Sequence, residues 1–263
     1  MRTPMRVTRT KNRPECEIPM SEVFPATLLH AIDRWQKGGD HAAKMRRGER
    51  LKQEVLVLND ANLRWCPEVV YRRLALPQKY IWTFITTGAL PETISAWTLD
   101  PDVARGLKGG VPPEWRDGKR WLGVILEHKP KPEEIIVNLD ALWVDVRYQR
   151  SFKEAAPEKY AEGIRRYENS QREVVLDLAR VSLKQIWSWG GYSSSVEDLT
   201  EMFLGAKPTP QQIDWVRRMI DEHEIQIGAR WTTSSGARNV TLRVIERAKS
   251  SGLPVPEDPA FLP

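Results

Sequence analysis

The sequence predicts an α+β fold, in which a strand-rich middle segment lies between two helical segments. Over residues 20–59, apolar residues recur at three- and four-residue intervals, as they do on the buried face of an α-helix. Between residues 69 and 189, short β-branched and apolar runs are separated by turn-forming residues, which is typical of strands. Beyond residue 189 the helical pattern returns. These observations together predict strands and helices that are segregated along the chain.

The N-terminal helical segment divides into two helices at a glycine pair. Its first apolar stripe runs from Phe24 to Trp35, and the turn at Gly38 and Gly39 separates it from a second helix over about 40–51. Residues 54–58 suit either a short strand or the end of that helix. The first 19 residues lack apolar periodicity and carry several basic residues and prolines, so we expect a flexible arm.

The middle segment is predicted to contain the strands of the fold. The expected strands lie at 69–74, 81–86, 93–98, 121–127, 134–139 and 171–176. A short helix is expected at 101–107, because Pro101 suits its first turn. Residues 108–120 hold three glycines and two prolines, which predict a loop, and residues 156–167 are charged and compatible with a helix.

The C-terminal part is predicted to be a helical extension. After a break at residues 190–195, amphipathic patterns cover 196–204 and 209–222, and a basic helix covers about 237–250. The domain organisation that follows is a basic arm at 1–19, a main domain with its N-terminal helices at 20–189, and a helical extension at 190–263.

Composition and charge narrow the class of protein. No apolar run approaches the roughly 18 residues that span a bilayer. The two cysteines show no metal or disulfide spacing, which favours a reducing, cytoplasmic setting. The first 13 residues carry five cations and no acid, which accounts for the whole formal net charge of +5. The four histidines lack ligand spacing, so no metal is expected, and no Gly-x-Gly-x-x-Gly predicts a Rossmann-type nicotinamide site.

Three of the expected strands each carry one polar residue inside an apolar run. Arg72 follows Tyr71, Ser95 follows Ile94, and Glu173 precedes two valines. An unpaired buried polar group costs about 1–3 kcal/mol, so such residues need a structural or chemical reason. Arg72, Ser95 and Glu173 are therefore the candidate site residues.

In this order, the three strands resemble those of the NAD-dependent mono-ADP-ribosyltransferases of the arginine–serine–glutamate type, here with a Gln-x-Glu motif. The resemblance covers about half of the chain, from residue 60 to residue 189. It implies an ADP-ribosyltransferase-like split β-sandwich core, with NAD as the substrate. The motif departs from the family pattern at Arg73, where glycine is usual, and at Ala96 and Trp97, which follow the serine.

The resemblance also implies roles for the three residues. The reaction breaks the bond between nicotinamide and ribose through an oxocarbenium-like state, whose positive charge a carboxylate stabilises. Glu173 is expected to be that carboxylate, and the hydroxyl of Ser95 to donate a hydrogen bond to it. The guanidinium of Arg72 suits the oxygens of the pyrophosphate. In the loop before the fourth expected strand, Arg116 and Arg120 are further candidates for binding the phosphates.

Two residues bear on the acceptor of ADP-ribose. In the family, an amide at the position of Gln171 is found in enzymes that modify protein asparagine and in enzymes that modify guanine in nucleic acid. Tyr167 occupies a position where relatives carry an aromatic residue that packs on the acceptor. With the basic arm, these features slightly favour a nucleic-acid base in RNA or DNA over a protein side chain such as Asn or Gln.

Other interpretations stay open at this stage. The family resemblance suggests a toxin-like protein of bacteria or phages, for which an antitoxin or inhibitor protein would be a partner. The chain could instead be a nucleic-acid-binding protein without enzymatic activity, using the arm, the basic helix and its tryptophans. A degenerate transferase fold that serves as an interaction module, and plain NAD hydrolysis with water as acceptor, are the remaining alternatives.

Overall fold

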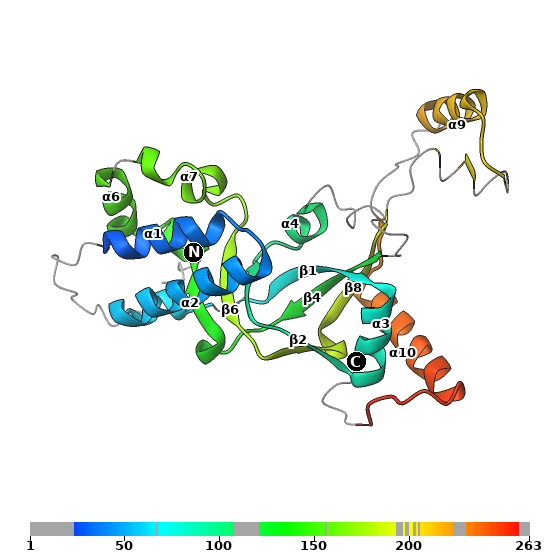
Figure 1. Cartoon of the computed structure of the whole chain (residues 1–263), viewed down its shortest axis with the longest axis horizontal. Coiled ribbons are helices and arrows are strands. Elements are labelled where there is room, and N and C mark those ends of the chain that lie inside the picture. The colour runs from blue at the N-terminus through cyan, green and yellow to red at the C-terminus, as the bar shows by residue number, and fades with distance from the viewer. Residues whose placement is uncertain are drawn as a thin grey trace, which may run out of the picture.

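The computed structural model describes residues 24–66, 68–107, 121–155, 157–192, 206–222 and 230–257, together with the single residues 197, 200, 201 and 204. It contains helices and antiparallel sheet, as the α+β prediction expected (Figure 1). The larger sheet has seven strands in the order β5-β6-β3-β1-β4-β8-β9. Its strands are β1 Val70–Pro77, β3 Ile94–Thr98, β4 Trp121–His128, β5 Ile135–Asn138, β6 Glu173–Asp177, β8 Ile186–Tyr192 and β9 Arg230–Trp231.

A two-stranded ribbon stands beside this sheet. Its strands, β2 Ala89–Pro91 and β7 Arg180–Ser182, pair antiparallel. The helices are α1 Ala26–Gln36, α2 His41–Leu58, α3 Gln78–Thr87, α4 Pro101–Gly106, α5 Leu139–Leu142, α6 Val146–Glu154, α7 Ile164–Tyr167, α9 Pro210–Glu222 and α10 Ser234–Ser250. Short 3₁₀ turns are η1 Ala61–Arg64, η3 Pro132–Glu134, η4 Pro157–Tyr160 and η5 Leu183–Gln185.

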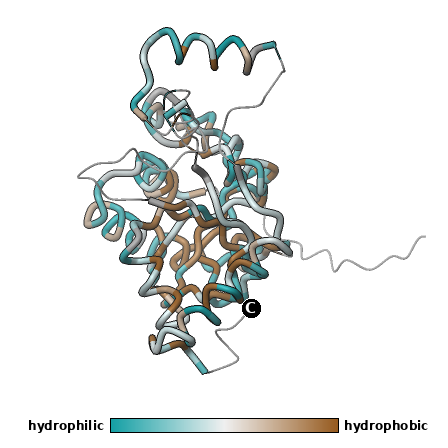
Figure 2. Tube along the Cα trace, turned by 90° about the vertical axis from the view of Figure 1, so that its right-hand side faces the viewer, coloured by the Kyte–Doolittle hydropathy of each residue, from teal (hydrophilic) through white to brown (hydrophobic). Residues whose placement is uncertain are grey.

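Two hydrophobic cores form around the larger sheet. One core contains Trp97, Val174 and Leu176 and is covered by residues of α3 and α10. The other contains Val175 and Val137 and is covered by α1, α2 and α6. Because side chains alternate along a strand, neighbouring residues of β6 enter different cores. The hydrophobic part of the chain accordingly gathers around the strands in Figure 2.

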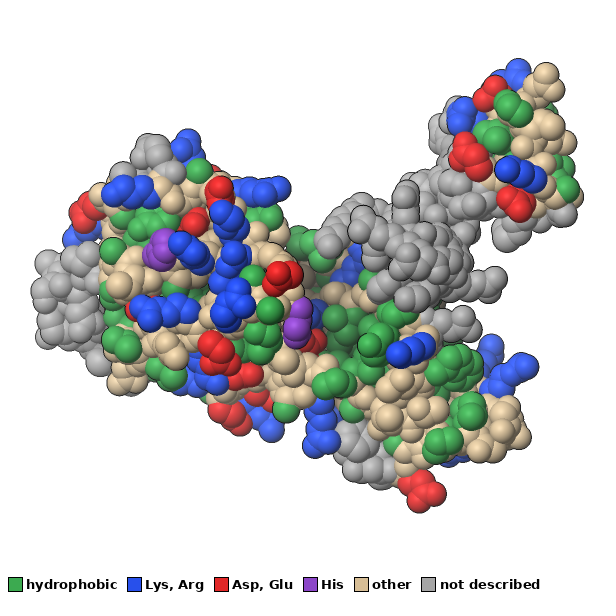
Figure 3. All heavy atoms as spheres, in the orientation of Figure 1, with side chains coloured by type: hydrophobic (Ala, Val, Ile, Leu, Met, Phe, Trp, Pro, Cys, Tyr) green, Lys and Arg blue, Asp and Glu red, His purple; other side chains and the backbone are tan. Residues whose placement is uncertain are grey.

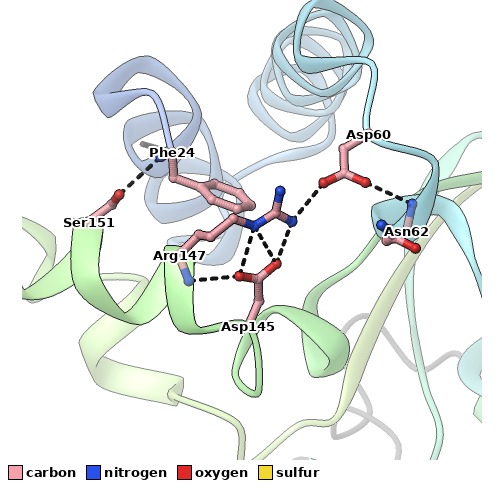
Figure 4. Close-up of polar contacts among 6 residues, drawn as sticks. All are labelled: Phe24, Asp60, Asn62, Asp145, Arg147 and Ser151. Carbon is pink, nitrogen blue, oxygen red and sulfur yellow. Dashed lines mark hydrogen bonds and ion pairs between the residues drawn. The ribbon is translucent and has the colours of Figure 1, made fainter. Parts of the chain in front are cut away.

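Arg147 connects α6 with η1 and with the residues before α1 (Figure 4). Arg147, at the start of α6, donates from Nη2 to Asp145 at 2.6 Å and to Asp60 at 2.7 Å. Its guanidinium also lies over the ring of Phe24, at 5.7 Å from the centroid. The backbone amide of Phe24 in turn donates to Ser151 of α6 at 3.0 Å. These contacts join η1, α6 and the residues that lead into α1.

One predicted element is wrong. Residues 81–86 were expected to form a strand, but they lie within helix α3. Ile81, Phe84 and Ile85 repeat at helical spacing and pack in one core, whereas Trp82 is exposed. The helix ends at Gly88, whose φ of 75° is readily adopted only without a Cβ. The β-branched composition was therefore outweighed by one buried helical face.

Other boundaries also differ from the sequence pattern. Residues 54–58, where a strand or a helix end was expected, are the last turns of α2. The break expected at residues 190–195 falls partly inside β8, which continues through Gly190 to Tyr192. The basic helix becomes α10, and Ala237, Ile245 and Ala248 of this helix are buried in the same core as the central strands.

Candidate functional site

The sheet brings the three polar strands side by side. Glutamate strand β6 pairs with serine strand β3, and β3 pairs with arginine strand β1. Segments that lie far apart in the sequence are thus neighbours in the order β6-β3-β1. The sequence placed a polar residue on each of these strands, and the register between the strands determines which of the residues can meet.

The register places Glu173 on one face of the sheet and Ser95 on the other. Residues directly opposite each other in an antiparallel pair share a face. Glu173 is opposite Thr98, whereas Ser95 is opposite Leu176, three positions along β6. Thr98 is in turn opposite Tyr71 of β1. A row of Tyr71, Thr98 and Glu173 therefore crosses the three strands on one face.

Arg72 lies on the face opposite to Glu173. Arg72 is opposite Leu126 of β4, and Val70 lies two positions before Arg72 on the same face of β1. Both Leu126 and Val70 belong to the core that contains Trp97. The guanidinium donates from Nη1 to the carbonyl of Ala96 at 2.9 Å, and Nε lies 3.2 Å from Glu92 in an ion pair. Burial lowers the pKa of Arg72, and the nearby Glu92 carboxylate partly offsets this effect by raising it. Its surroundings are those of a structural ion pair at the sheet.

Ser95 is buried, and its partner is a residue of its own strand. Its Oγ accepts a hydrogen bond from Nε1 of Trp97 at 3.0 Å. Ser95 and Trp97 are two positions apart and so share a face. The structure thus places Ser95 and Arg72 together on one face and Glu173 on the other.

Glu173 is buried beneath helix α1. The residue is 5% exposed. One carboxylate oxygen accepts from Nε1 of Trp35 at 2.7 Å, and the other accepts from Nε2 of Gln36 at 3.2 Å. Burial raises the pKa of Glu173, while the two donors and the positive charge of Lys44 lower it, and burial is the larger effect. The folded chain therefore holds a carboxyl group with increased affinity for a proton.

The residues expected to recognise the acceptor lie just before β6. Gln171 is outside the strand, and its backbone carbonyl accepts from Oγ1 of Thr98 at 2.7 Å. Arg172, between Gln171 and Glu173, has a φ of 42°, so the extended alternation expected for the Gln-x-Glu motif is interrupted there. Tyr167 ends α7, and the guanidinium of Arg166 lies over its ring. Arg116 and Arg120 fall outside the described residues.

Sequence reasoning missed the polar groups that share a face with Glu173. Arg73 is two positions from Tyr71, so it points to the same side of β1. Its guanidinium lies over the ring of Trp231, 5.3 Å from the centroid, and it donates to the carbonyl of Leu107. Burial lowers the pKa of Arg73. From the alternation of side chains along the strand alone, Arg73 is as good a candidate as Arg72 for the face that carries Glu173. The register between the strands shows that Arg73 is the one on that face.

Aromatic side chains continue this face toward β8. Tyr71 lies 5.0 Å from Trp187, measured between ring centroids. The guanidinium of Arg105 of α4 lies over the ring of Trp187, 4.6 Å from its centroid. Two arginine–tryptophan pairs therefore occur beside the strand that carries Arg73. Guanidinium groups and aromatic rings are suited to bind phosphates and to stack on planar bases, respectively.

The described residues contain no group of three or more His, Cys, Asp or Glu side chains suited to hold a metal ion. Among the helices that the structure describes, none combines the length and the apolar character that crossing a bilayer requires. Comparison of the chain with protein-family models, curated proteins and solved structures finds no match.

Proposed function

We propose that this chain is a mono-ADP-ribosyltransferase, a glycosyltransferase-class enzyme that cleaves NAD and transfers ADP-ribose to a macromolecule. The observation that carries the proposal is the adjacency of β6, β3 and β1, the three strands on which the sequence resemblance depends. The buried carboxyl group of Glu173 lies at the start of β6, on a face that also carries Arg73. An anion and a cation on one face suit a ribose that develops positive charge and a pyrophosphate, respectively.

In this proposal, the residues that bind NAD on this face differ in part from those that the sequence pattern predicted. Glu173 stabilises the positive charge at the ribose carbon as its bond to the nicotinamide nitrogen breaks, and the bonding electrons leave with neutral nicotinamide. Arg73, in place of Arg72, pairs with the phosphates. Thr98, in place of Ser95, is the hydroxyl residue beside Glu173. The acceptor atom then forms the new bond to the ribose carbon and releases a proton to water.

NAD as the substrate requires a rearrangement near Glu173. The carboxylate is engaged by Trp35 and Gln36 at the end of α1, and Glu173 is almost fully buried. The longer of the two bonds, from Gln36 at 3.2 Å, is the one that a ribose hydroxyl would replace. A macromolecular acceptor would approach from the side of Gln171 and Tyr167, with a nucleic-acid base slightly favoured over a protein amide.

The test of this proposal is release of nicotinamide from NAD. Glu173→Gln removes the charge and keeps the shape, so turnover should fall by about 10²–10³, as when one charge-stabilising group is lost from an enzyme. Exposed Glu133→Gln is the matched control and should leave turnover unchanged. A Glu173→Gln variant that turns over NAD like the unmodified chain would contradict the proposal. Labelled NAD incubated with separate RNA, DNA and protein pools would identify the acceptor class.

A second experiment distinguishes the two neighbouring arginines. If Arg73 binds the phosphates, Arg73→Gln should raise KM for NAD about tenfold or more, the cost of a lost charge-assisted hydrogen bond. Arg165→Gln, at an exposed position of α7, is the matched control. A normal KM in Arg73→Gln would remove this residue from the site.

An interaction module without catalysis is the second candidate, and the covering of Glu173 favours it. Both carboxylate oxygens of Glu173 already accept hydrogen bonds from residues of α1, so they have partners without a bound sugar. Titration of the unmodified chain with NAD in a calorimeter separates the candidates. Binding heat supports the transferase, whereas its absence at millimolar NAD supports the module.

A further inference from the structure

Helices α1 and α2 form a basic groove on the side of the molecule away from the sheet. The groove is a cavity of about 390 Å³, and its wall is contributed by one stripe of each helix. The lining residues are Thr27, His30, Ala31 and Arg34 of α1, and Ala43, Arg46, Arg47 and Arg50 of α2. Figure 3 shows Lys and Arg side chains gathered over these two helices.

The lining residues of each helix are spaced so that they lie on one face of that helix. The lining positions of α1 follow the intervals three, one and three, and those of α2 follow the same intervals, so each set lies on one helix face. The opposite face of α1, with Leu28, Leu29 and Ile32, is buried in the core. The groove therefore uses the faces that hydrophobic packing leaves free.

The electrostatics of the groove are one-sided. Four arginines and one histidine line it, and no acidic side chain occurs among the described lining residues. Arg50 forms an ion pair with Glu54, and Nε of Arg34 donates to Nε2 of His30 at 3.2 Å. Nη1 of Arg47 is buried and has no hydrogen-bond partner in the described part of the chain. A buried guanidinium donor without a partner is costly, and a turn of the Arg47 side chain toward an anion bound in the groove would satisfy it.

We infer that this groove binds the phosphate backbone of a single nucleic-acid strand. Guanidinium forks match phosphate oxygens, and several of them along a groove match a chain of regularly repeated anions. The small side chains Thr27, Ala31 and Ala43 leave space between the arginines. No Phe, Tyr or Trp side chain occurs among the described lining residues, so recognition rests on phosphates and is independent of base sequence.

The groove concentrates positive charge within a part of the chain whose net charge is zero. The first 13 residues account for the formal net charge of +5, so the remaining chain is neutral as a whole. A cluster of four arginines in a neutral body is a local site for a polyanion. The inference concerns binding alone and holds whether or not Glu173 acts on NAD, so it is measured without NAD.

The experiment measures fluorescence anisotropy of labelled 20-nucleotide single-stranded RNA and DNA with the full chain. The groove variant combines Arg34→Gln, Arg46→Gln and Arg47→Gln. The matched control removes three charges from exposed positions of α10, with Arg238→Gln, Arg243→Gln and Arg247→Gln. All variants keep the basic residues 1–13. Circular dichroism and thermal unfolding check that each variant is folded.

We expect the groove variant to bind both oligonucleotides at least tenfold more weakly. The slope of log affinity against log salt should become shallower by about two, since each lost phosphate contact on a single strand changes it by roughly 0.7. The α10 control should change affinity less than threefold. Arg46→Gln alone, at an exposed position, should weaken binding about threefold and guards against misfolding of the triple variant.

Three outcomes would overturn the inference. The first is equal affinity of the groove variant and the unmodified chain. The second is a larger loss in the α10 control than in the groove variant. The third is tighter, groove-dependent binding of poly-glutamate than of RNA or DNA at equal charge, which would assign the groove to an acidic protein segment.

Discussion

At the scale of single residues, the buried carboxyl group of Glu173 makes the stability of the fold depend on pH. Its carboxyl group is buried, accepts hydrogen bonds from Trp35 and Gln36, and has a pKa that burial raises. A carboxyl group whose pKa is higher in the folded than in the unfolded chain binds protons more tightly when folded. Its contribution to stability is therefore complete below the unfolded pKa of about 4.3 and is lost as the pH rises through the folded value.

Glu173→Gln should accordingly stabilise the chain in a pH-dependent manner. At low pH both side chains are neutral, so the melting temperatures should be similar. Above the pH at which the unfolded carboxyl group ionises, folding of the unmodified chain must either bury that charge or bind a proton, so the variant should melt several degrees higher. Thermal unfolding from pH 4 to pH 8 measures this difference, with exposed Glu133→Gln as the control. A difference that does not grow with pH would show that burial does not govern this carboxyl group.

At the scale of elements, the close approach of α2 to its neighbours depends on a glycine. Gly48 lies inside α2, where glycine costs about 0.5–1 kcal/mol relative to alanine. A Cβ at this position would lie 2.7 Å from Cγ2 of Ile94 and 3.0 Å from Cζ3 of Trp35. The absence of a side chain thus lets α2 pack against both the serine strand and the helix that covers Glu173.

Gly48→Ala should destabilise the fold although alanine favours a helix. Overpacking of a close contact costs about 1–3 kcal/mol, which exceeds the gain in helix propensity. Chemical denaturation measures the change in free energy of unfolding. Gly106→Ala is the control, because a Cβ there would have no neighbour within 4 Å. A Gly48→Ala variant as stable as the unmodified chain would mean that Ile94 and Trp35 shift at little cost.

At the scale of the whole molecule, one sheet separates two cores, and both ends of the described chain take part in them. Helices α1 and α2 cover one face, and α3 and α10 contribute to the core on the other. Ile245 of α10 is 3% exposed and belongs to the core that contains Trp97. The C-terminal helix therefore stabilises the sheet, although its sequence is basic and follows a change in composition.

Ile245→Ala tests whether α10 unfolds together with the sheet. Truncation of a buried isoleucine costs about 2–5 kcal/mol, and we expect a single cooperative transition at lower denaturant concentration. Leu242→Ala, at a more exposed position of the same helix, should cost much less. Two separate transitions, or an unchanged midpoint in Ile245→Ala, would show that α10 is not part of the cooperative unit.

The sequence alone determined the α+β class, most of the helices and the strands that carry Arg72, Ser95 and Glu173, because apolar periodicity is a local property that short segments retain. It could not determine which polar residues meet. Arg72 and Arg73 differ by one position, and one position reverses the face of a strand. The tertiary structure decided which polar residues share a face. It did so through the pairing of Thr98 with Glu173, the left-handed backbone of Arg172 and the packing of α1 over Glu173, which depend on contacts between segments far apart in the chain.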